Sequence, residues 1–297
     1  MKKYLFVLFL FLTGCFNNPT PPSWYLNTPK SNDVYIYASA EGNTKKEAID
    51  SALSYLASKL QVKITSSFNT QKSYIESNGE KSVYQNLSQN IKTSVENFTF
   101  YNYETDKLEK KGEKYYALVK INRIKNAEKI IQNIKNSLKN LPKLNDGAII
   151  NLQNAIKAQK KINKLKNSYK LAKILNPDTD NIAFPEIYNK TIQSTSFSVV
   201  SNDKELKNLL LNYISKKYTI SNNPDITIKA DIGYSIRKIV GQYLANANLT
   251  MTISDNKTQK SYFYTCAASS YNPGIAKKLA LKKCAIKAQK TLQKLFY

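Results

Sequence analysis

The spacing of apolar and polar residues changes along the chain, and each change predicts an element. Residues 34–39 alternate the apolar residues Val34, Ile36 and Ala38 with Tyr35, Tyr37 and Ser39, a period of two that is typical of a strand. Gly42 ends this run, and Thr44 and Glu47 then form a T-x-x-E capping box. A helix therefore begins at Thr44, and its apolar stripe consists of Ala48, Ile49, Ala52, Leu53, Leu56 and Leu60.

The next segments predict further strands. Residues 61–68, QVKITSSF, have the composition of a strand, which we expect to follow the helix. Residues 98–123 contain two strand-like runs around a charged turn with Gly112, which predicts a hairpin. Residues 69–97 are polar and fit either strand or helix. The prediction for this part is a strand, a helix and several antiparallel strands.

Between residues 126 and 175 the apolar residues recur every three or four positions, which predicts two packed helices. The turn between them lies at 142–147, and Asn176-Pro177 ends the second helix. Eight lysines between 143 and 173 stand against the single acid Asp146 and make one face of this helix positive. We interpret that face as solvated, with contact to an acidic partner as the alternative.

The last third repeats the pattern of strands and helices. Residues 194–201 predict a strand, and Asn202 and Glu205 are expected to cap the helix that follows. Three antiparallel strands are then predicted at 225–236, 243–253 and 261–270, and a final helix from about 274. One face of this helix carries Leu281, Cys284, Ala285, Ala288, Leu292 and Leu295, and the other carries Lys283, Lys287, Lys290 and Lys294.

These elements predict an α+β protein with two small α/β domains, each with an antiparallel sheet and packed helices, joined by a helical hairpin. The expected domains are a lipoprotein signal peptide at 1–14, a proline-rich tether at 15–32, a first α+β domain at 33–125, the helical hairpin at 126–178 and a second α+β domain at 179–297. Trp24 and Tyr25 lie inside the tether, and we expect them to fasten it to the first domain.

The N-terminal segment has the form of an export signal. Lys2 and Lys3 precede the apolar run 5–12, which as a helix covers roughly 12 Å, far less than a bilayer core of about 30 Å. The run ends in Leu12-Thr13-Gly14-Cys15, which resembles the lipobox of bacterial lipoproteins. The resemblance implies cleavage before Cys15 and a diacylglycerol on its thiol, which anchors the chain in a membrane. The alternative is an ordinary signal peptide with an incidental cysteine.

Two further cysteines remain after Cys15. Cys284 is predicted to face the sheet whose last strand contains Cys266, and disulfides persist outside the cytoplasm. We therefore expect a disulfide between Cys266 and Cys284, with two buried reduced thiols as the alternative.

The formal net charge of +24 would normally suggest a nucleic-acid partner, but the type and distribution of the basic residues argue against one. Arg123 and Arg237 are the two arginines among 45 basic residues, and arginine is the usual reader of bases and phosphates. The lysines are spread along an exported chain, so we exclude nucleic acid as a partner. Attraction to anionic lipid or lipopolysaccharide stays open.

The sequence offers little catalytic chemistry. It contains no histidine, which excludes histidine-based triads and imidazole metal sites. Ser201 to Lys204 and Ser254 to Lys257 both match S-x-x-K, a motif of penicillin-recognising enzymes, but no K-T-G accompanies them. Both lie beside predicted turns or caps, where serine satisfies backbone amides. We expect no catalytic residues, no metal, no cofactor and no enzyme activity.

The first domain resembles a known family. The residues that carry the resemblance are Pro22, Trp24, Tyr25, Gly42, Glu47, Ala48, Ala52 and Leu56, and the later run EKYYALVKI is similar to the closing strand of the family. They resemble the LPP-twenty family of lipoproteins, which includes flagellar assembly proteins of the FlgP and FlgT type. The family often has glycine in the first strand, where this chain has Ala38 and Ala40. In the family these positions serve packing, so the resemblance implies a scaffold and not an enzyme.

Together these observations predict a lipid-anchored, non-catalytic lipoprotein of the cell envelope. We expect it at the outer membrane, facing the periplasm, because Phe16 is not the aspartate that signals retention in the inner membrane. It would act as a scaffold or assembly component through protein partners or self-assembly, in a flagellar or other envelope machine. The alternative is a lipid-anchored binding module for anionic lipid, lipopolysaccharide or another envelope polymer.

The anchor predicts a simple labelling result. Cys15→Ala removes the thiol that accepts the lipid, so the variant should incorporate no radiolabelled or clickable fatty acid when it is produced in cells. The parent chain provides the positive control, and an intact mass that includes acyl groups identifies the modified residue. Labelling that persists in the variant would contradict the anchor.

Overall fold

The structure is a computed structural model that describes residues 20–75 and 103–297. The chain forms two compact units, the first made of Met1–Asn136 and Leu165–Asn181 and the second of Ser137–Lys164 and Ile182–Tyr297. The α+β fold class predicted from the sequence is confirmed, since helices and two sheets are present in the described chain. Helices α4 (Arg123–Lys139) and α5 (Ala148–Leu175) each contribute residues to both units.

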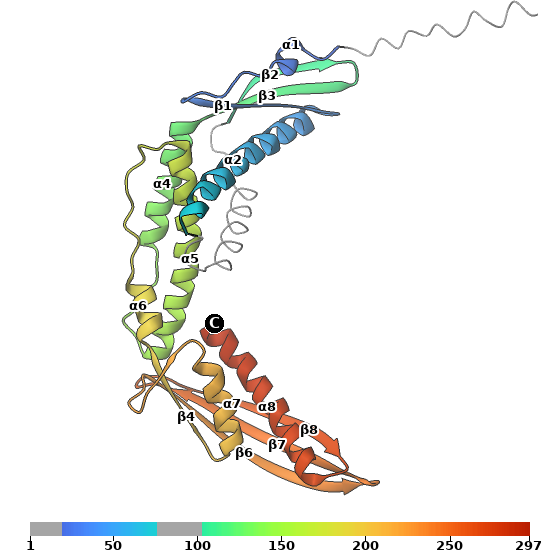
Figure 1. The fold of residues 1–297 in the computed structure, drawn as a ribbon, viewed down its shortest axis with the longest axis vertical. Coiled ribbons are helices and arrows are strands. Elements are labelled where there is room, and N and C mark those ends of the chain that lie inside the picture. Colours follow the sequence, from blue (N-terminus) through green and yellow to red (C-terminus); the bar gives the residue numbers. More distant parts are fainter. Residues whose placement is uncertain (1–19, 76–102) are drawn as a thin grey trace, which may run out of the picture. The chain divides into compact units, whose positions relative to one another are not determined.

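The sheet of the first unit contains β1 (Tyr35–Gly42), β2 (Tyr103–Lys111) and β3 (Lys114–Asn122) in the order β1-β3-β2. Both pairings are antiparallel, and Gly112 has a positive φ of 61° in the turn of the predicted hairpin. Helix α2 (Lys45–Ile75) packs on β1 and β3 (Figure 1). Among its side chains from Lys45 to Leu60, those of Ala48, Ala52, Leu56 and Leu60 are buried.

The capping box at the start of α2 is confirmed. The Glu47 amide donates to Thr44 Oγ1 at 3.1 Å, and the Glu47 carboxylate accepts from the Asn43 amide at 2.8 Å. A Cβ on Gly42 would lie 2.4 Å from the Ala48 nitrogen, so the chain can enter the helix this closely only at a glycine.

The strand predicted at 61–68 is wrong, because α2 continues through this segment to Ile75. Between Lys45 and Ile75 there is no glycine or proline, and each residue added to an existing helix gains a hydrogen bond without a new nucleus. The strand-like composition of 61–68 is therefore outweighed by the helix that precedes it. The ambiguous run 69–97 lies outside the described residues after Ile75.

The tether is fastened to the first unit as expected. Trp24 lies in the short helix α1 (Ser23–Leu26), and its indole donates to Glu109 Oε2 at 3.1 Å. The Tyr25 ring contacts the Tyr116 ring with centroids 4.8 Å apart. The hydrogen bonds from Lys111 and Trp24 lower the pKa of Glu109.

Arg123 joins three chain segments of the first unit. Its guanidinium donates to the carbonyls of Leu175 and Ile174 at the end of α5, at 3.0 and 2.9 Å, and to the Asn32 carbonyl at 3.1 Å. A cation there satisfies free carbonyls and the negative end of the helix dipole.

The second unit contains a five-stranded sheet in the order β5-β4-β6-β7-β8. Its strands are β4 (Ser196–Ser201), β5 (Thr219–Ile220), β6 (Ile226–Ile239), β7 (Gln242–Ser254) and β8 (Gln259–Ser270). The last three pair antiparallel, as predicted from the sequence. β4 pairs parallel to β5 and β6, which the sequence analysis did not anticipate.

Two helices cover one face of this sheet, as Figure 1 shows. Helix α7 (Lys204–Ile214) packs on β4, and α8 (Pro273–Phe296) packs on β7 and β8. The core beneath them includes Phe197, Leu206, Leu210, Ile228, Ala247, Leu249, Met251, Cys284, Ala288 and Phe296. A further helix, α6 (Ile187–Ser194), supplies Tyr188 to a cluster with Ala155, Ala158 and Ile162 of α5.

The predicted cap of α7 is wrong in its residue. Asp203 is the N-cap, and its Oδ1 accepts from the Leu206 amide at 3.0 Å. Asn202 instead pairs with β6, donating to the Ile232 carbonyl at 3.0 Å and accepting from the Ile232 amide at 2.9 Å. Both residue types cap helices well, and only the approach of β6 decides between them.

Asp255, in the turn after β7, fastens this turn to the first turn of α5. Its carboxylate accepts from the amides of Ile149, Lys257 and Thr258, at 2.7, 2.8 and 2.6 Å. A Cβ on Gly147 would lie 2.7 Å from Asp255 Oδ2, so this contact requires a glycine. Burial raises the pKa of Asp255, but the hydrogen bonds outweigh it and the pKa is lowered from its ordinary value.

This lowered pKa predicts how stability depends on pH. Because the folded pKa lies below the unfolded one, the contribution of Asp255 is complete above about pH 4 and is lost as the pH falls through the folded pKa. Asp255→Asn should lower the free energy of unfolding by about 1–2 kcal/mol at neutral pH. Urea unfolding at several pH values measures both, and the gap between parent and variant should shrink in acid. A gap that is constant or grows in acid would contradict the assignment.

Candidate functional site

Of the three predicted site residues, the structure describes Cys266 and Cys284. Cys15 lies outside the described residues. Cys266 of β8 and Cys284 of α8 are both buried and joined by a disulfide, with their Cα atoms 5.6 Å apart. The bond links the last helix to the edge strand of the sheet.

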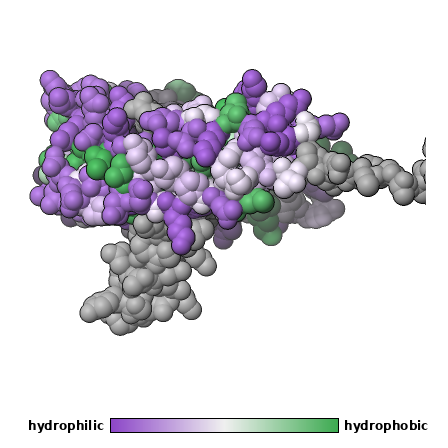
Figure 2. All heavy atoms as spheres, turned by 90° about the horizontal axis from the view of Figure 1, so that it is seen from above, coloured by the Kyte–Doolittle hydropathy of each residue, from purple (hydrophilic) through white to green (hydrophobic). Residues whose placement is uncertain are grey.

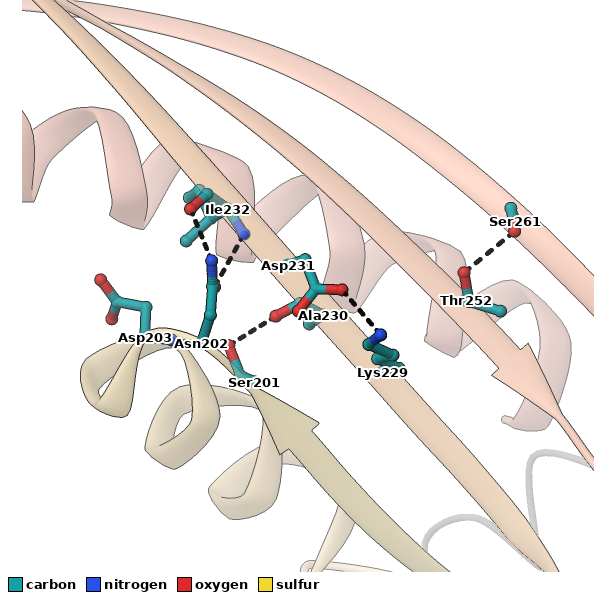
Figure 3. A network of polar contacts seen from close by, with 9 residues as sticks. All are labelled: Ser201, Asn202, Asp203, Lys229, Ala230, Asp231, Ile232, Thr252 and Ser261. Atoms are coloured by element: carbon teal, nitrogen blue, oxygen red, sulfur yellow. Dashed lines mark hydrogen bonds and ion pairs between the residues drawn. The ribbon is translucent and has the colours of Figure 1, made fainter.

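The first S-x-x-K serine is engaged in the backbone (Figure 3). Ser201 Oγ donates to the Ala230 carbonyl on β6 at 2.5 Å and accepts from the Asp203 amide at 3.1 Å. Lys204 is exposed at the start of α7. Ser201 therefore joins β4 to β6, as Figure 3 shows.

The second S-x-x-K motif is also built into a turn. Ser254 is the last residue of β7, and the Lys257 amide donates to Asp255 Oδ1 at 2.8 Å. The turn closes with the Asp255 amide on the Thr258 carbonyl at 2.9 Å. In both motifs, then, the polar groups serve turns and strand joins.

The same turn lines a polar pocket of about 460 Å³ in the second unit. Three aspartates surround it, Asp146, Asp225 and Asp255, from segments far apart in the sequence. Asp225 Oδ2 accepts from the Ser196 amide and hydroxyl, both at 2.8 Å, and Asp146 Oδ1 accepts from the Gly147 amide at 2.8 Å. Each carboxylate thus fastens a turn.

This pocket cannot be recognised from the sequence, because each aspartate has the local pattern of a turn residue and only the fold brings the three together. Within residues 20–75 and 103–297, no group of three His, Cys, Asp or Glu side chains is arranged to hold a metal ion. No helix in the same residues is both long and apolar enough to cross a bilayer.

The face of the second sheet that α7 and α8 do not cover is polar. Thr252 pairs with Ser261 at 2.9 Å, and Thr265 donates to Asn248 Oδ1 at 3.0 Å. Figure 3 shows the Thr252–Ser261 pair bridging neighbouring strands. Large apolar side chains on this face include Phe263, with 76% of its surface exposed, and Val200, with 51%.

Strand β8 is an edge of the sheet, and no described strand pairs with its outer side. Two lysines of α8 reach its backbone: Lys283 donates to the Ala267 carbonyl and Lys287 to the Thr265 carbonyl, both at 2.9 Å. Lysines that cover edge carbonyls are a common protection against unwanted strand pairing. Residues 259–264 of the same edge have no lysine contact of this kind among the described side chains.

Lysine dominates the outer face of α8, as the sequence predicted. Lys283, Lys287, Lys290 and Lys294 are all exposed, while Leu281, Cys284, Ala285, Ala288 and Leu292 are buried and Leu295 is half-buried. The surface that Figure 2 shows is mostly hydrophilic, with apolar residues scattered in small groups.

One protein-family model matches the N-terminal part of the chain. Residues 22–122, about a third of the chain, match the family model described as LPP20 lipoprotein. The resemblance to the LPP-twenty family that rests on Pro22, Trp24, Tyr25 and Gly42 is thereby confirmed for this segment. No curated protein sequence matches the chain.

Among solved structures, the chain is similar to the secreted protein HP1454 from the human pathogen Helicobacter pylori, with 19% sequence identity and a TM-score of 0.51. The similarity covers 91% of this chain and 100% of that protein, so the two share a fold over both units. Lipoprotein GNA1162 from Neisseria meningitidis also matches, at 12% identity and a TM-score of 0.23, over 32% of this chain and 98% of its own.

The disulfide predicts a loss of stability on reduction. Its 18-residue separation corresponds to about 3 kcal/mol in the chain-entropy model. The double variant Cys266→Ala/Cys284→Ala should therefore unfold at lower urea concentration, and dithiothreitol should destabilise the parent and leave the variant unchanged. Mass mapping without reduction should recover the linked peptides. Two freely alkylated thiols in the native protein would contradict the bond.

Proposed function

We propose that the protein is a lipid-anchored, non-catalytic lipoprotein of the cell envelope that assembles with partner proteins or with itself. The match of residues 22–122 to the LPP20 lipoprotein family supports its membership among lipoproteins. Anchoring through Cys15, location at the outer membrane and orientation toward the periplasm belong to the proposal. A flagellar or other envelope machine is the proposed setting.

The observation that carries the assembly role is the outer edge of β8, which no strand of the described residues pairs. A 12-residue edge strand presents a row of backbone donors and acceptors, to which an extended segment of another chain can pair. The contacts of Lys283 and Lys287 with the Ala267 and Thr265 carbonyls occupy the later part of the edge. The segment 259–264 is therefore the proposed place of strand addition.

The engagement of the candidate catalytic groups supports a non-catalytic role. Ser201 is bonded to the Ala230 carbonyl, and the Asp255 carboxylate accepts three backbone amides. A nucleophile needs a base within reach, and a general acid or base needs a proton to exchange with substrate. Groups held in this way serve folding instead.

Binding of anionic lipid, lipopolysaccharide or another envelope polymer is a second candidate function. The excess of lysine favours it: 45 basic residues stand against 21 acidic ones. Such a field attracts anionic surfaces and weakens with salt. Partners held by strand addition should instead remain bound at high salt, because backbone hydrogen bonds and apolar contacts hold them.

Capture of partners from membranes tests the assembly role. Tagged protein should retain specific proteins after a high-salt wash. Phe263→Pro should lose them, because proline removes the backbone N–H of residue 263. Residue 263 alternates with 265 and 267, so its backbone groups point to the same outer edge as the Thr265 and Ala267 carbonyls.

Phe263→Ser is the matched control, since it removes the same side chain and keeps the amide. Circular dichroism and urea unfolding show whether either variant is folded. Equal capture by parent and Phe263→Pro would contradict strand addition at β8, and loss of all proteins in high salt would favour the second candidate function.

A further inference from the structure

The turn between β6 and β7 has an unusual residue at an unusual conformation. Val240 has φ of 39° and Gly241 has φ of 78°, so both central residues lie in the left-handed region. Two-residue hairpin turns of this kind favour asparagine followed by glycine. A β-branched residue is disfavoured at positive φ, and Val240 is also 98% exposed. Neither backbone preference nor burial accounts for valine at this position.

Other exposed apolar side chains lie at the same end of the sheet. Tyr243 of β7 pairs with Lys238 of β6 and with Ser270 of β8, so the end of β8 lies beside the turn. Figure 1 shows the β6–β7 turn, the end of β8 and the start of α8 together. We define the hairpin tip as the exposed apolar residues Ile236, Ile239, Val240, Tyr271 and Ile275.

Basic residues surround the hairpin tip. Arg237 and Lys238 lie within the hairpin, and Lys277 and Lys278 lie on the first turns of α8. The Lys238 ammonium lies 5.8 Å from the centre of the Tyr243 ring, and the Lys277 ammonium lies 4.4 Å from that of Tyr234. Among the described residues, one acid forms an ion pair with these cations: Glu205 Oε1 lies 3.9 Å from the Lys278 ammonium.

We propose that the hairpin tip binds an anionic lipid surface. Val240 and its apolar neighbours enter the boundary of the acyl chains, while Arg237, Lys238, Lys277 and Lys278 contact the headgroup phosphates. Exposed apolar residues bordered by cations are the chemistry of proteins that lie on anionic membranes, and long basic side chains keep their charges at the headgroups. The inference gives a site to the second candidate function, anionic lipid binding, and does not depend on strand addition at β8.

Vesicle binding of the full chain tests the inference. Cys15→Ser is introduced into every sample, so that no acyl anchor contributes. The chain should sediment with vesicles that contain phosphatidylglycerol more than with pure phosphatidylcholine vesicles, and added salt should reduce the difference. Val240→Asn should reduce binding by at least about fivefold, the loss expected when one exposed valine no longer leaves water.

Val240→Asn separates binding from folding. Asparagine suits the left-handed turn, so the variant should be at least as resistant to urea as the parent while it binds less. Phe263→Ser removes another exposed apolar side chain, outside the hairpin tip, and should leave vesicle binding unchanged.

Equal binding by Val240→Asn and the parent, or an equal loss in Phe263→Ser, would overturn the proposal. So would the absence of any preference for phosphatidylglycerol. Proteins captured through the hairpin tip without vesicle binding would identify a protein partner and would also overturn it. None of these outcomes bears on strand addition at β8, which the capture experiment with Phe263→Pro tests separately.

Discussion

Close packing of a small-residue helix face on each sheet is the constraint on which the structure depends. In the second unit, Ala276, Ala280, Cys284 and Ala288 recur at every fourth position of α8 and are all fully buried. Alanine and cysteine allow the helix backbone to approach the strands, where β7 also carries small residues such as Ala247. The disulfide to Cys266 is compatible only with this short separation. Ala48 and Ala52 of α2 have the same role over Ala38 of β1 in the first unit.

Because α7 and α8 lie on one face of the second sheet, its other face carries no helix among the described residues, and no described strand pairs with the outer side of its edge strand β8. The uncovered face is stabilised by small polar pairs such as Thr252 with Ser261, which need no partner layer. The uncovered edge is different, because backbone groups there keep their capacity to pair. Lys283 and Lys287 occupy the Ala267 and Thr265 carbonyls and so reduce that capacity over the later part of β8.

Three aspartates of the second unit are engaged in hydrogen bonds that hold its turns, strands and a helix cap. Asp203 caps α7 and accepts from Tyr234, Asp225 holds the Ser196 hydroxyl, and Asp255 binds three amides. These hydrogen bonds leave the negative charges in place, so the basic character of the hairpin tip comes from its own cations, Arg237, Lys238, Lys277 and Lys278. The positive φ of Val240 marks a residue there that backbone preference alone does not select.

The sequence by itself determined the local elements, because their signals are local. The capping box of Thr44 and Glu47, the turn at Gly112 and the apolar stripe of α8 all depend on residues within a few positions of one another. It also indicated that Cys284 faces the strand of Cys266, since helix and strand periods both place these residues inward. Its strand at 61–68 was wrong, because composition carries less weight than a helix that is already nucleated.

Only the tertiary structure decided which distant segments meet. The parallel pairing of β4 with β6 assigns Asn202 to the Ile232 backbone and leaves the cap of α7 to Asp203. The same packing brings Asp255 to the first turn of α5 and leaves β8 as an edge strand of the described sheet. These contacts join residues separated by tens of positions or more, and their energies depend on geometry that no local pattern of residues encodes.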